Sequence, residues 1–296
     1  MAASLTASRR IKEKLGDRIV NIVIVFILFC VLVVTLYPFL HVISVSISNP
    51  TEVLENRVTF YPRGFFFKCY ERVMQDRFFL RSYLNTLIYT TLGVLINIFM
   101  TVTMAYPLSR TKFMGKSIFL PLIVFTMIFT TGIIPHYLLV MQLGMIDKIW
   151  AIILPPAVNT FNLMILRTSF AAMPVELEES AKIDGANDFQ VLMRVCLPVS
   201  KAILMTIGLF YTVEHWNRFM APFLYLNTRE KYPLQVVLRG MLISGEMAEY
   251  VDFDQLLVTT MVKYTTIVVS ILPVLFIYPF IQRYFTKGVL LGSLKG

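Results

Sequence analysis

A Gly-Lys-Ser triplet at positions 115–117 is the first segment whose residue types could bind a phosphate. The P-loop motif needs its first glycine five residues before Gly115, and Arg110 occupies that position. The motif also follows a β-strand, whereas this triplet lies between two long apolar segments. We therefore expect the chain not to bind ATP through such a loop.

Side chains for catalysis or metal binding are sparse. The three histidines, His41, His136 and His215, are far apart in the chain, and no Cys/His cluster accompanies them. No Ser/His/Asp arrangement is indicated by spacing. The sequence predicts neither a metal site nor an enzyme active site.

Ionisable residues are scarce within the apolar segments, and their main cluster is Glu-His-Trp-Asn-Arg at positions 214–218. Such groups in a membrane usually face a cavity or one another, and a tryptophan beside amide and charge could bind a sugar ring. Glu214, Trp216 and Asn217 are therefore candidates for a polar substrate pathway. Alternatively, Glu214 pairs with Arg218 one turn on, and Trp216 anchors the helix at the membrane interface.

Two asparagines, Asn159 and Asn162, follow a Pro155-Pro156 break and share a face at three-residue spacing. They could line the same polar path. Alternatively, they bond to carbonyls that the break releases.

A polar stretch of about 30 residues, 171–201, separates two apolar segments and has the pattern of a helical hairpin. Pro174 suits a first helical turn, and the acidic residues that follow suit the positive end of the helix dipole. Glu178 can pair with Lys182, and Gly185 can adopt the left-handed conformation that ends the helix.

A second helix of this stretch is predicted to begin after Asn187 and to end at Pro198. Its apolar residues recur at helical spacing: Phe189, Leu192, Met193 and Cys196. The hairpin offers a compact surface to a partner, and small residues at Ser180 and Ala181 would allow close approach. Alternatively, it lies in the headgroup region as an interfacial helix pair.

The composition indicates that most of this chain lies in a membrane. Of its 296 residues 57% are hydrophobic and 15% charged, and the mean hydropathy is +0.70. A bilayer core of about 30 Å requires about 20 apolar residues per helix. The sequence contains such windows at about 19–45, 83–108, 117–141, 149–170, 202–223 and 265–285. Prolines interrupt most of them, so the helices are expected to be bent.

The basic residues indicate the orientation. The apolar run after the basic segment 1–18 has about 25 residues, too long for a signal-peptide core of roughly 7 to 15, so we expect a retained helix. The short loop 109–116 and the tail 287–296 are basic, which places both termini in the cytoplasm. Basic residues also occur in the segment 46–82, where acidic residues partly offset them. The net charge of +9 forms no long basic run, so no nucleic-acid partner is expected.

This topology places the three cysteines in different surroundings. Cys30 falls in a helix, Cys69 in an outer loop and Cys196 in an inner loop, so no internal disulfide is expected.

The 171–201 stretch also resembles a known family. Glu179-Ser180-Ala181, then Gly185 after three residues, then Val195-Cys196-Leu197-Pro198 after nine more, is similar to the signature loop of ATP-binding-cassette (ABC) importer permeases. That signature is Glu-Ala-Ala, three residues, Gly, nine residues, Ile, any residue, Leu-Pro. Ser180 and Val195 depart from it by small changes in size.

Other segments extend this resemblance over most of the chain. Asp184-Gly185-Ala186 looks closest to the sugar-importing, maltose-type branch. Individually weak matches resemble the subgroup for complex oligosaccharides, at 132–135, 137–140, 161–163, 232–235 and 287–296.

The resemblance implies an all-α integral membrane protein with six transmembrane helices, the type I ABC importer permease fold, in a bacterial cytoplasmic membrane. Within the domain 19–286, the loop 171–201 would couple to ATPase subunits through Glu179, Ser180, Ala181, Asp184, Gly185, Leu197 and Pro198. The chain itself would bind no cofactor, because ATP and Mg would be held by the partner subunits.

The implied partners are two ATPase subunits, an extracytoplasmic sugar-binding protein and a second permease. We expect the second permease to be a different chain, although a homodimer is left open. The outer loop 227–263 would contact the binding protein, or would simply be solvated. Its late part carries Glu246, Glu249, Asp252 and Asp254.

Two other functions compete with import driven by ATP. An ion-coupled secondary transporter would need acids in several spans and often has inverted repeats, whereas the spans here contain chiefly Glu214 and no obvious repeat. A membrane enzyme is disfavoured by the missing catalytic constellation.

Overall fold

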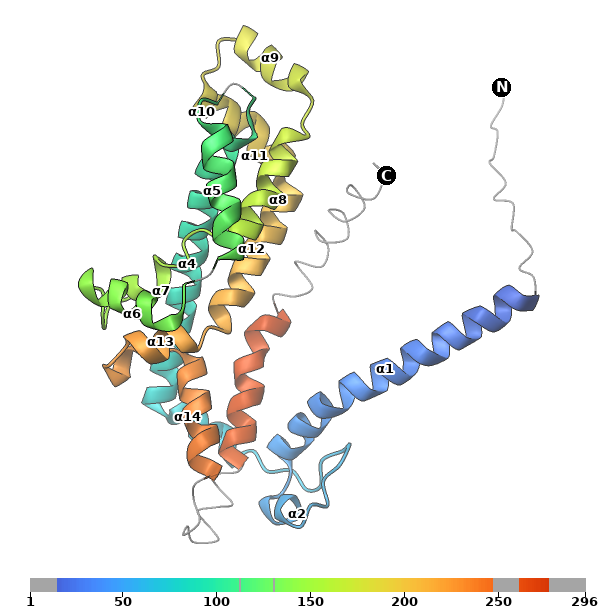
Figure 1. The fold of residues 1–296 in the computed structure, drawn as a ribbon. Coiled ribbons are helices and arrows are strands. Elements are labelled where there is room, and N and C mark those ends of the chain that lie inside the picture. Colours follow the sequence, from blue (N-terminus) through green and yellow to red (C-terminus); the bar gives the residue numbers. More distant parts are fainter. Residues whose placement is uncertain (1–14, 112, 130, 247–260, 277–296) are drawn as a thin grey trace. The chain divides into compact units, whose positions relative to one another are not determined.

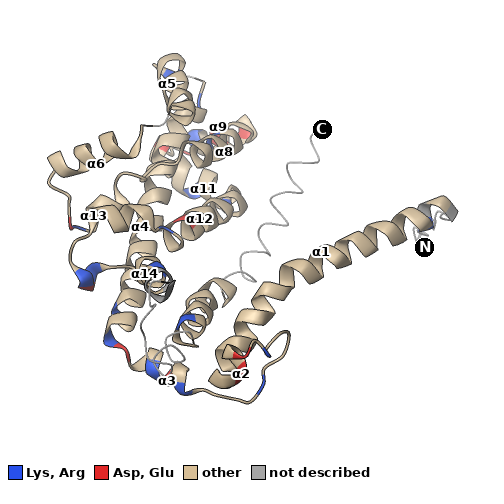
Figure 2. Ribbon diagram, turned by 60° about the horizontal axis from the view of Figure 1, so that its bottom comes forward, with Lys and Arg blue, Asp and Glu red and all other residues tan. Residues whose placement is uncertain are grey.

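The computed structural model describes residues 15–111, 113–129, 131–246 and 261–276, and all regular secondary structure in these ranges is helical (Figure 1). The chain forms two compact units, one of residues 1–69 with 252–265 and the other of residues 70–251 with 266–296. Figure 2 shows that the bodies of the long helices carry few charged residues, which lie mostly at helix ends and in loops.

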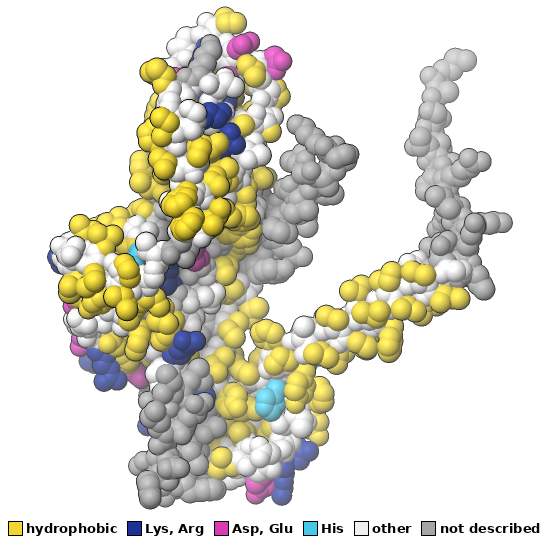
Figure 3. Space-filling model, viewed as in Figure 1, with side chains coloured by type: hydrophobic (Ala, Val, Ile, Leu, Met, Phe, Trp, Pro, Cys, Tyr) yellow, Lys and Arg dark blue, Asp and Glu magenta, His cyan; other side chains and the backbone are white. Residues whose placement is uncertain are grey.

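The first unit is dominated by a single long apolar helix, α1 (Leu15–Ile47), which confirms the predicted first helix. Its side chains are exposed over most of its length, and Figure 3 shows hydrophobic side chains along it. The chain then folds back past α2 (Pro50–Leu54), and Ser44 Oγ donates to the carbonyl of Phe60 at 3.0 Å. A small core forms in this unit, from Val45, Val58, Cys69 and Met261.

Two described helices are long and apolar enough to cross a membrane singly, at Arg18–Ile47 and Arg77–Ser109. If each of two bent helix pairs also counts as one span, the number rises to four. After α3 (Lys68–Gln75), α4 (Arg77–Ser109) begins six residues before the predicted position 83. The reason is a cap, because Asp76 Oδ1 accepts the N–H groups of Phe78 and Phe79.

The third predicted helix is divided in two, α5 (Lys116–Ile128) and α6 (Ile133–Gln142). The division lies between its two prolines. Pro121 is accommodated inside α5. Pro135 lies in the first turn of α6, where a backbone N–H would have no acceptor within the helix, so its absence costs no hydrogen bond.

The fourth predicted helix is divided where the sequence indicated, with Pro155 and Pro156 between α7 (Trp150–Ile153) and α8 (Thr160–Ala171). The fifth is shorter than predicted, because α12 (Lys201–Trp216) ends before Asn217 and α13 (Met220–Tyr225) follows. In a continuous helix the ring of Pro222 would clash with the carbonyl of Arg218, which explains the interruption.

The stretch 227–263 is not simply a polar loop. After a short 3-10 helix at Arg229–Lys231, α14 (Leu234–Glu246) packs against α4, with Leu234, Val236 and Val237 buried. Of the acidic residues expected late in this stretch, positions 249, 252 and 254 lie outside the described residues. The last helix described is Met261–Phe276, which begins four residues before the predicted start at 265.

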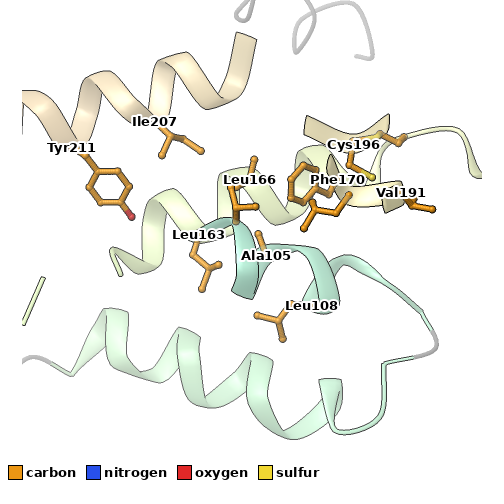
Figure 4. Packing of buried hydrophobic residues seen from close by; sticks show 12 residues of the cluster. Ala105, Leu108, Leu163, Leu166, Phe170, Val191, Cys196, Ile207 and Tyr211 are labelled. Atoms are coloured by element: carbon orange, nitrogen blue, oxygen red, sulfur yellow. The ribbon is translucent and has the colours of Figure 1, made fainter. Parts of the chain in front are cut away.

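The core of the second unit lies where α4, α8 and α12 pack together. Figure 4 shows this packing, in which Leu163, Leu166 and Phe170 of α8 are fully buried. Ala105 and Leu108 come from α4, and Ile207 and Tyr211 from α12. At one end the core continues into the 171–201 stretch through Val191 and Cys196.

Candidate functional site

The 171–201 stretch forms the predicted helical hairpin at the C-terminal end of α4. Its first helix, α9 (Val175–Ile183), begins directly after Pro174, which precedes the first turn instead of belonging to it. Gly185 has φ +83°, the left-handed conformation expected for the residue that ends this helix.

The second arm of the hairpin begins with α10 (Asp188–Val191), which Asn187 caps as predicted. The Asn187 side chain accepts the N–H of Gln190 at 2.8 Å, and the Gln190 side chain accepts the N–H of Asn187 at 2.9 Å.

The arm then continues as a π-helix (Leu192–Cys196) and as α11 (Leu197–Val199). The N–H of Leu197 bonds five residues back to Leu192, and Pro198 follows with no N–H to donate. The arm therefore ends one residue after Pro198, at a bend of 83° before α12.

The predicted ion pair between Glu178 and Lys182 is wrong. Glu178 pairs instead with Arg110 at the end of α4, and Lys182 pairs with Asp188 at 2.9 Å. The hydrogen bond that the Lys182 ammonium donates to the Asp188 carboxylate raises the pKa of Lys182. Glu178 therefore faces the bundle, where it pairs with a half-buried arginine instead of the more exposed lysine one turn away.

The neighbouring residues of α9 face outward. Glu179 and Ser180 are exposed, and Ala181, Asp184 and Gly185 line a pocket of about 320 Å³ together with Arg194 and Val195. Leu197 is half-buried and Pro198 is exposed.

Two large apolar side chains are also exposed on the hairpin, Ile183 at 86% and Phe189 at 67%. Ile183 was not foreseen from the sequence, in which its only signal is its position just before the Asp-Gly turn. Large exposed apolar side chains are typical of a surface that binds a protein partner.

Polar side chains meet where α7 and α8 are separated. Asn159 caps α8 by accepting the N–H of Asn162 at 3.2 Å, and its own N–H donates to Tyr211 Oη at 3.1 Å. Asn159 thus serves a backbone N–H at the start of α8, whereas the expected bonds were to carbonyls that the break releases. Asn162 is 2% exposed.

A third asparagine, which was not foreseen from the sequence, also contacts this break. Asn97 of α4 donates from Nδ2 to the carbonyl of Pro156 at 2.6 Å, and its Oδ1 lies 2.9 Å from His215 Nε2. The imidazole packs directly against Gly93, one turn before Asn97. The available signal was a Gly93, Asn97, Thr101 series at four-residue spacing within an apolar helix.

Most side chains of the 214–218 cluster make contacts within the protein. Glu214 pairs with Arg218, as one reading of the sequence expected, and Arg218 also donates to the carbonyl of Ile152 at 3.1 Å. Trp216 is 4% exposed and packs edge-to-face on Tyr83, with ring centroids 6.1 Å apart. Glu214 and Asn217 remain exposed.

A third polar group centres on Asp147, between α6 and α7, and was not foreseen from the sequence. Its carboxylate accepts the N–H groups of Asn227 and Thr228 at 2.9 Å and the ammonium of Lys231 at 2.6 Å. The Lys231 hydrogen bond, followed by those from Thr228, holds the pKa of Asp147 well below its usual range. We name this group, Asp147 with residues 227–231, the Asp147 latch.

The latch is connected to the N-terminal half of α4. Tyr89 Oη donates to the carbonyl of Lys231 at 2.9 Å, and Asn85 Nδ2 donates to the carbonyl of Glu230 at 2.7 Å. The hydroxyl of Thr86 accepts the N–H of Leu234 at 2.8 Å.

A bundle of apolar helices that presents a capped hairpin at one end is the architecture of a membrane permease driven by a separate protein. Comparison with known proteins agrees with this class. The chain is 40% identical over 291 residues to the polygalacturonan/rhamnogalacturonan transport system permease protein YtcP of Bacillus subtilis, covering 96% of this chain and 100% of the relative. It is 41% identical to protein LplC of the same organism, over 89% of this chain and 90% of the relative.

A solved structure agrees as well. The chain matches, at 35% identity and a TM-score of 0.86, a chain in the crystal structure of a bacterial ABC transporter involved in the import of the acidic polysaccharide alginate. The match covers 92% of this chain and 99% of that one. A scan against protein-family models found no matching family. On the strength of these relatives, the chain belongs to the ABC transporter permeases, and the ion-coupled secondary transporter is not favoured.

Proposed function

We propose that this chain is a permease subunit of an ATP-driven importer, in which it forms part of the translocation pathway for an oligosaccharide. The observation that carries the proposal is the 171–201 hairpin, anchored to the bundle on the Glu178 side and exposed on the Glu179 side. That arrangement suits an element that receives motion from a partner and passes it to membrane helices.

The proposed topology has six spans and both termini in the cytoplasm of a bacterial cell. In this topology the hairpin and the Arg110 end of α4 face the cytoplasm, and the Asp147 latch faces outward. The basic loop 109–116 supports this orientation, because positive residues are retained on the cytoplasmic side.

The proposed complex contains a second permease, two ATPase subunits that hold ATP and Mg, and an extracytoplasmic binding protein. The exposed surface of the hairpin offers the ATPase both acidic residues (Glu179, Asp184) and apolar ones (Ile183, Phe189). On the other face of the membrane, the stretch 227–263 would meet the binding protein.

We further propose that the substrate is an acidic oligosaccharide. Polygalacturonan is a polymer of a uronic acid, and alginate is named as acidic, so two relatives share this chemistry. On this chain two exposed arginines lie over aromatic rings, Arg229 over Phe78 and Arg239 over Phe219, both at 4.3 Å from the ring centroid. Stacking orders a guanidinium and leaves its edge free to bind a carboxylate.

The pathway within the membrane is assigned to the region of Asn159, Asn162, Glu214, Trp216 and Asn217. Glu214 and Asn217 are exposed and can meet a sugar directly. The buried Asn162 and Trp216, with the helix cap Asn159, would act by shaping the wall behind them.

The experiment that tests the proposal is Glu179→Lys in the complex reconstituted with its ATPase subunits and loaded binding protein. We expect one of two results: the ATPase subunits are lost on purification, or the rate of ATP hydrolysis no longer rises when loaded binding protein is added. The local change in helix stability is only about 0.3 to 1 kcal/mol, too little to unfold the bundle.

Glu176→Lys is the matched control, because it reverses the same charge at an exposed position in the first turn of the same helix. This variant should retain the ATPase subunits, and its ATP hydrolysis should still rise when loaded binding protein is added. If Glu179→Lys keeps both its ATPase subunits and the stimulation of ATP hydrolysis by loaded binding protein, the hairpin has no coupling role.

A further inference from the structure

Arg110, directly after α4, contacts four separate segments of the second unit. Its guanidinium pairs with Glu178 of α9, donates to the carbonyl of Phe170 in α8 at 3.4 Å, and donates to Cys196 Sγ in the π-helix at 3.3 Å. It also lies over the ring of Tyr106 in α4, 4.7 Å from the ring centroid.

These contacts are shielded from solvent. The Arg110 side chain is 23% exposed and that of Glu178 is 13% exposed. A charge pair that is partly removed from water is stronger and less screened by salt than a surface pair. Burial raises the pKa of the Cys196 thiol, so this sulfur accepts the hydrogen bond as a neutral group and leaves Glu178 as the charged partner.

The pair differs from the other ion pair of the hairpin. Lys182 and Asp188 join the two arms of the hairpin to each other, and both are largely exposed. The Arg110–Glu178 pair instead joins the hairpin to a helix of the bundle. The hairpin is also held to the bundle by the packing of Val191 and Cys196 in the core, and the Arg110–Glu178 pair adds a charged contact on the side of α9.

Glu178 and Glu179 are adjacent in α9 and therefore point about 100° apart around the helix axis. One faces Arg110 and the other faces outward. A displacement applied to the exposed side of α9 thus acts directly on the Arg110 contacts.

We propose that Arg110 is a positioning residue that locks the hairpin to the bundle, so that movement of α9 is passed to α4 and α8. The inference rests on the proposed transport function. Because α4 has 33 residues, it is about 50 Å long and carries this movement to its N-terminal half, where Asn85, Thr86 and Tyr89 contact residues 230–234.

A double-mutant cycle in the reconstituted complex tests the inference, with Arg110→Met, Glu178→Met and the double variant. The readout is the amount of oligosaccharide imported per ATP hydrolysed. Substitution of a residue needed only for folding would reduce the number of assembled complexes but would leave this ratio unchanged in those that assemble. We expect each single variant to lower this ratio by roughly two- to thirtyfold, the range over which residues between coupled sites change the coupling. The double variant should be no worse than the poorer single variant, because the two side chains act as one unit.

Lys201→Met is the matched control, since Lys201 is exposed at the start of α12 and its loss also removes one positive charge. It should keep the wild-type ratio. If Arg110→Met does not assemble, Arg110→Lys retains the charge opposite Glu178 but cannot reach all the acceptors, and its ratio should be intermediate.

The outcomes separate this inference from the proposed function. No ATP-dependent uptake by the wild-type complex would overturn the function itself. If the wild-type complex imports oligosaccharide, two results would overturn the role of Arg110 alone. One is an unchanged import per ATP in the Arg110 and Glu178 variants, and the other is a double variant in which the effects of the two single variants multiply.

Discussion

His215 Nε2 lies 2.9 Å from Asn97 Oδ1 in the interior of the second unit, and the same amide holds the carbonyl of Pro156 through its Nδ2 atom. Because an amide oxygen only accepts, Nε2 is the donor of this bond. α12 and the break between α7 and α8 are therefore both fastened to one position on α4.

The close approach of His215 to α4 requires glycine at position 93. A Cβ atom there would overlap all three ring atoms Nδ1, Cε1 and Nε2 of the imidazole. We expect Gly93→Ala to destabilise the protein by about 1 to 3 kcal/mol through overpacking, measured as a lower Tm in detergent. In Gly208→Ala the new atom would meet only Ile98 Cδ1 at 3.4 Å, so this control should be neutral or slightly stabilising. Equal Tm values for the two variants would contradict the packing argument.

The Asp147 latch predicts a pH dependence. Because the pKa of Asp147 is lowered on folding, the latch adds stability fully above the unfolded pKa of about 3.9 and loses it as pH falls towards the folded value. Asp147→Asn should lower stability at pH 7 by about 1 kcal/mol, since both Asp147 and Lys231 keep part of their hydration. The difference in Tm between wild type and variant should shrink below about pH 4. A difference that grows as the pH is lowered would have the wrong sign for this latch.

The turn of the hairpin depends on Gly185. Its φ of +83° is closed to proline, and its N–H donates to the carbonyl of Lys182 at 3.0 Å. Gly185→Pro should abolish uptake while the protein remains in the membrane in normal amount. Gly185→Asn is the control, because asparagine tolerates the left-handed conformation and keeps the N–H, so most of the uptake should survive. Normal uptake by the proline variant would rule out a role for the turn in coupling.

Single cysteines at exposed positions test the orientation, after replacement of Cys30, Cys69 and Cys196. A thiol reagent that cannot cross the membrane should label Lys148→Cys beside the latch in intact cells, but should label Glu176→Cys on the hairpin only after lysis. Both native side chains are exposed, unlike Glu178, whose pairing with Arg110 would confuse the result. The opposite labelling pattern would invert the proposed topology.

Much of the hairpin could be predicted from the sequence alone, because its determinants are local. The left-handed Gly185, the cap at Asn187 and the acidic first turn of α9 each depend on residues within one helical turn. The apolar windows likewise reflect the solvent that surrounds a helix, which acts on each residue independently of its distant neighbours.

Only the tertiary structure decided which partner each polar group has. Glu178 had a suitable lysine one turn away, yet it pairs with an arginine 68 positions earlier in the chain. The four-residue spacing from Gly93 places Asn97 on one helix face, but the partners of Asn97 and of Asp147 could not be assigned from the sequence. These partners come from helices and loops more than 50 residues away. In a low-dielectric interior, an unpaired polar group is so costly that the folded bundle selects the partner that can be buried with it, and sequence distance has no influence on that choice.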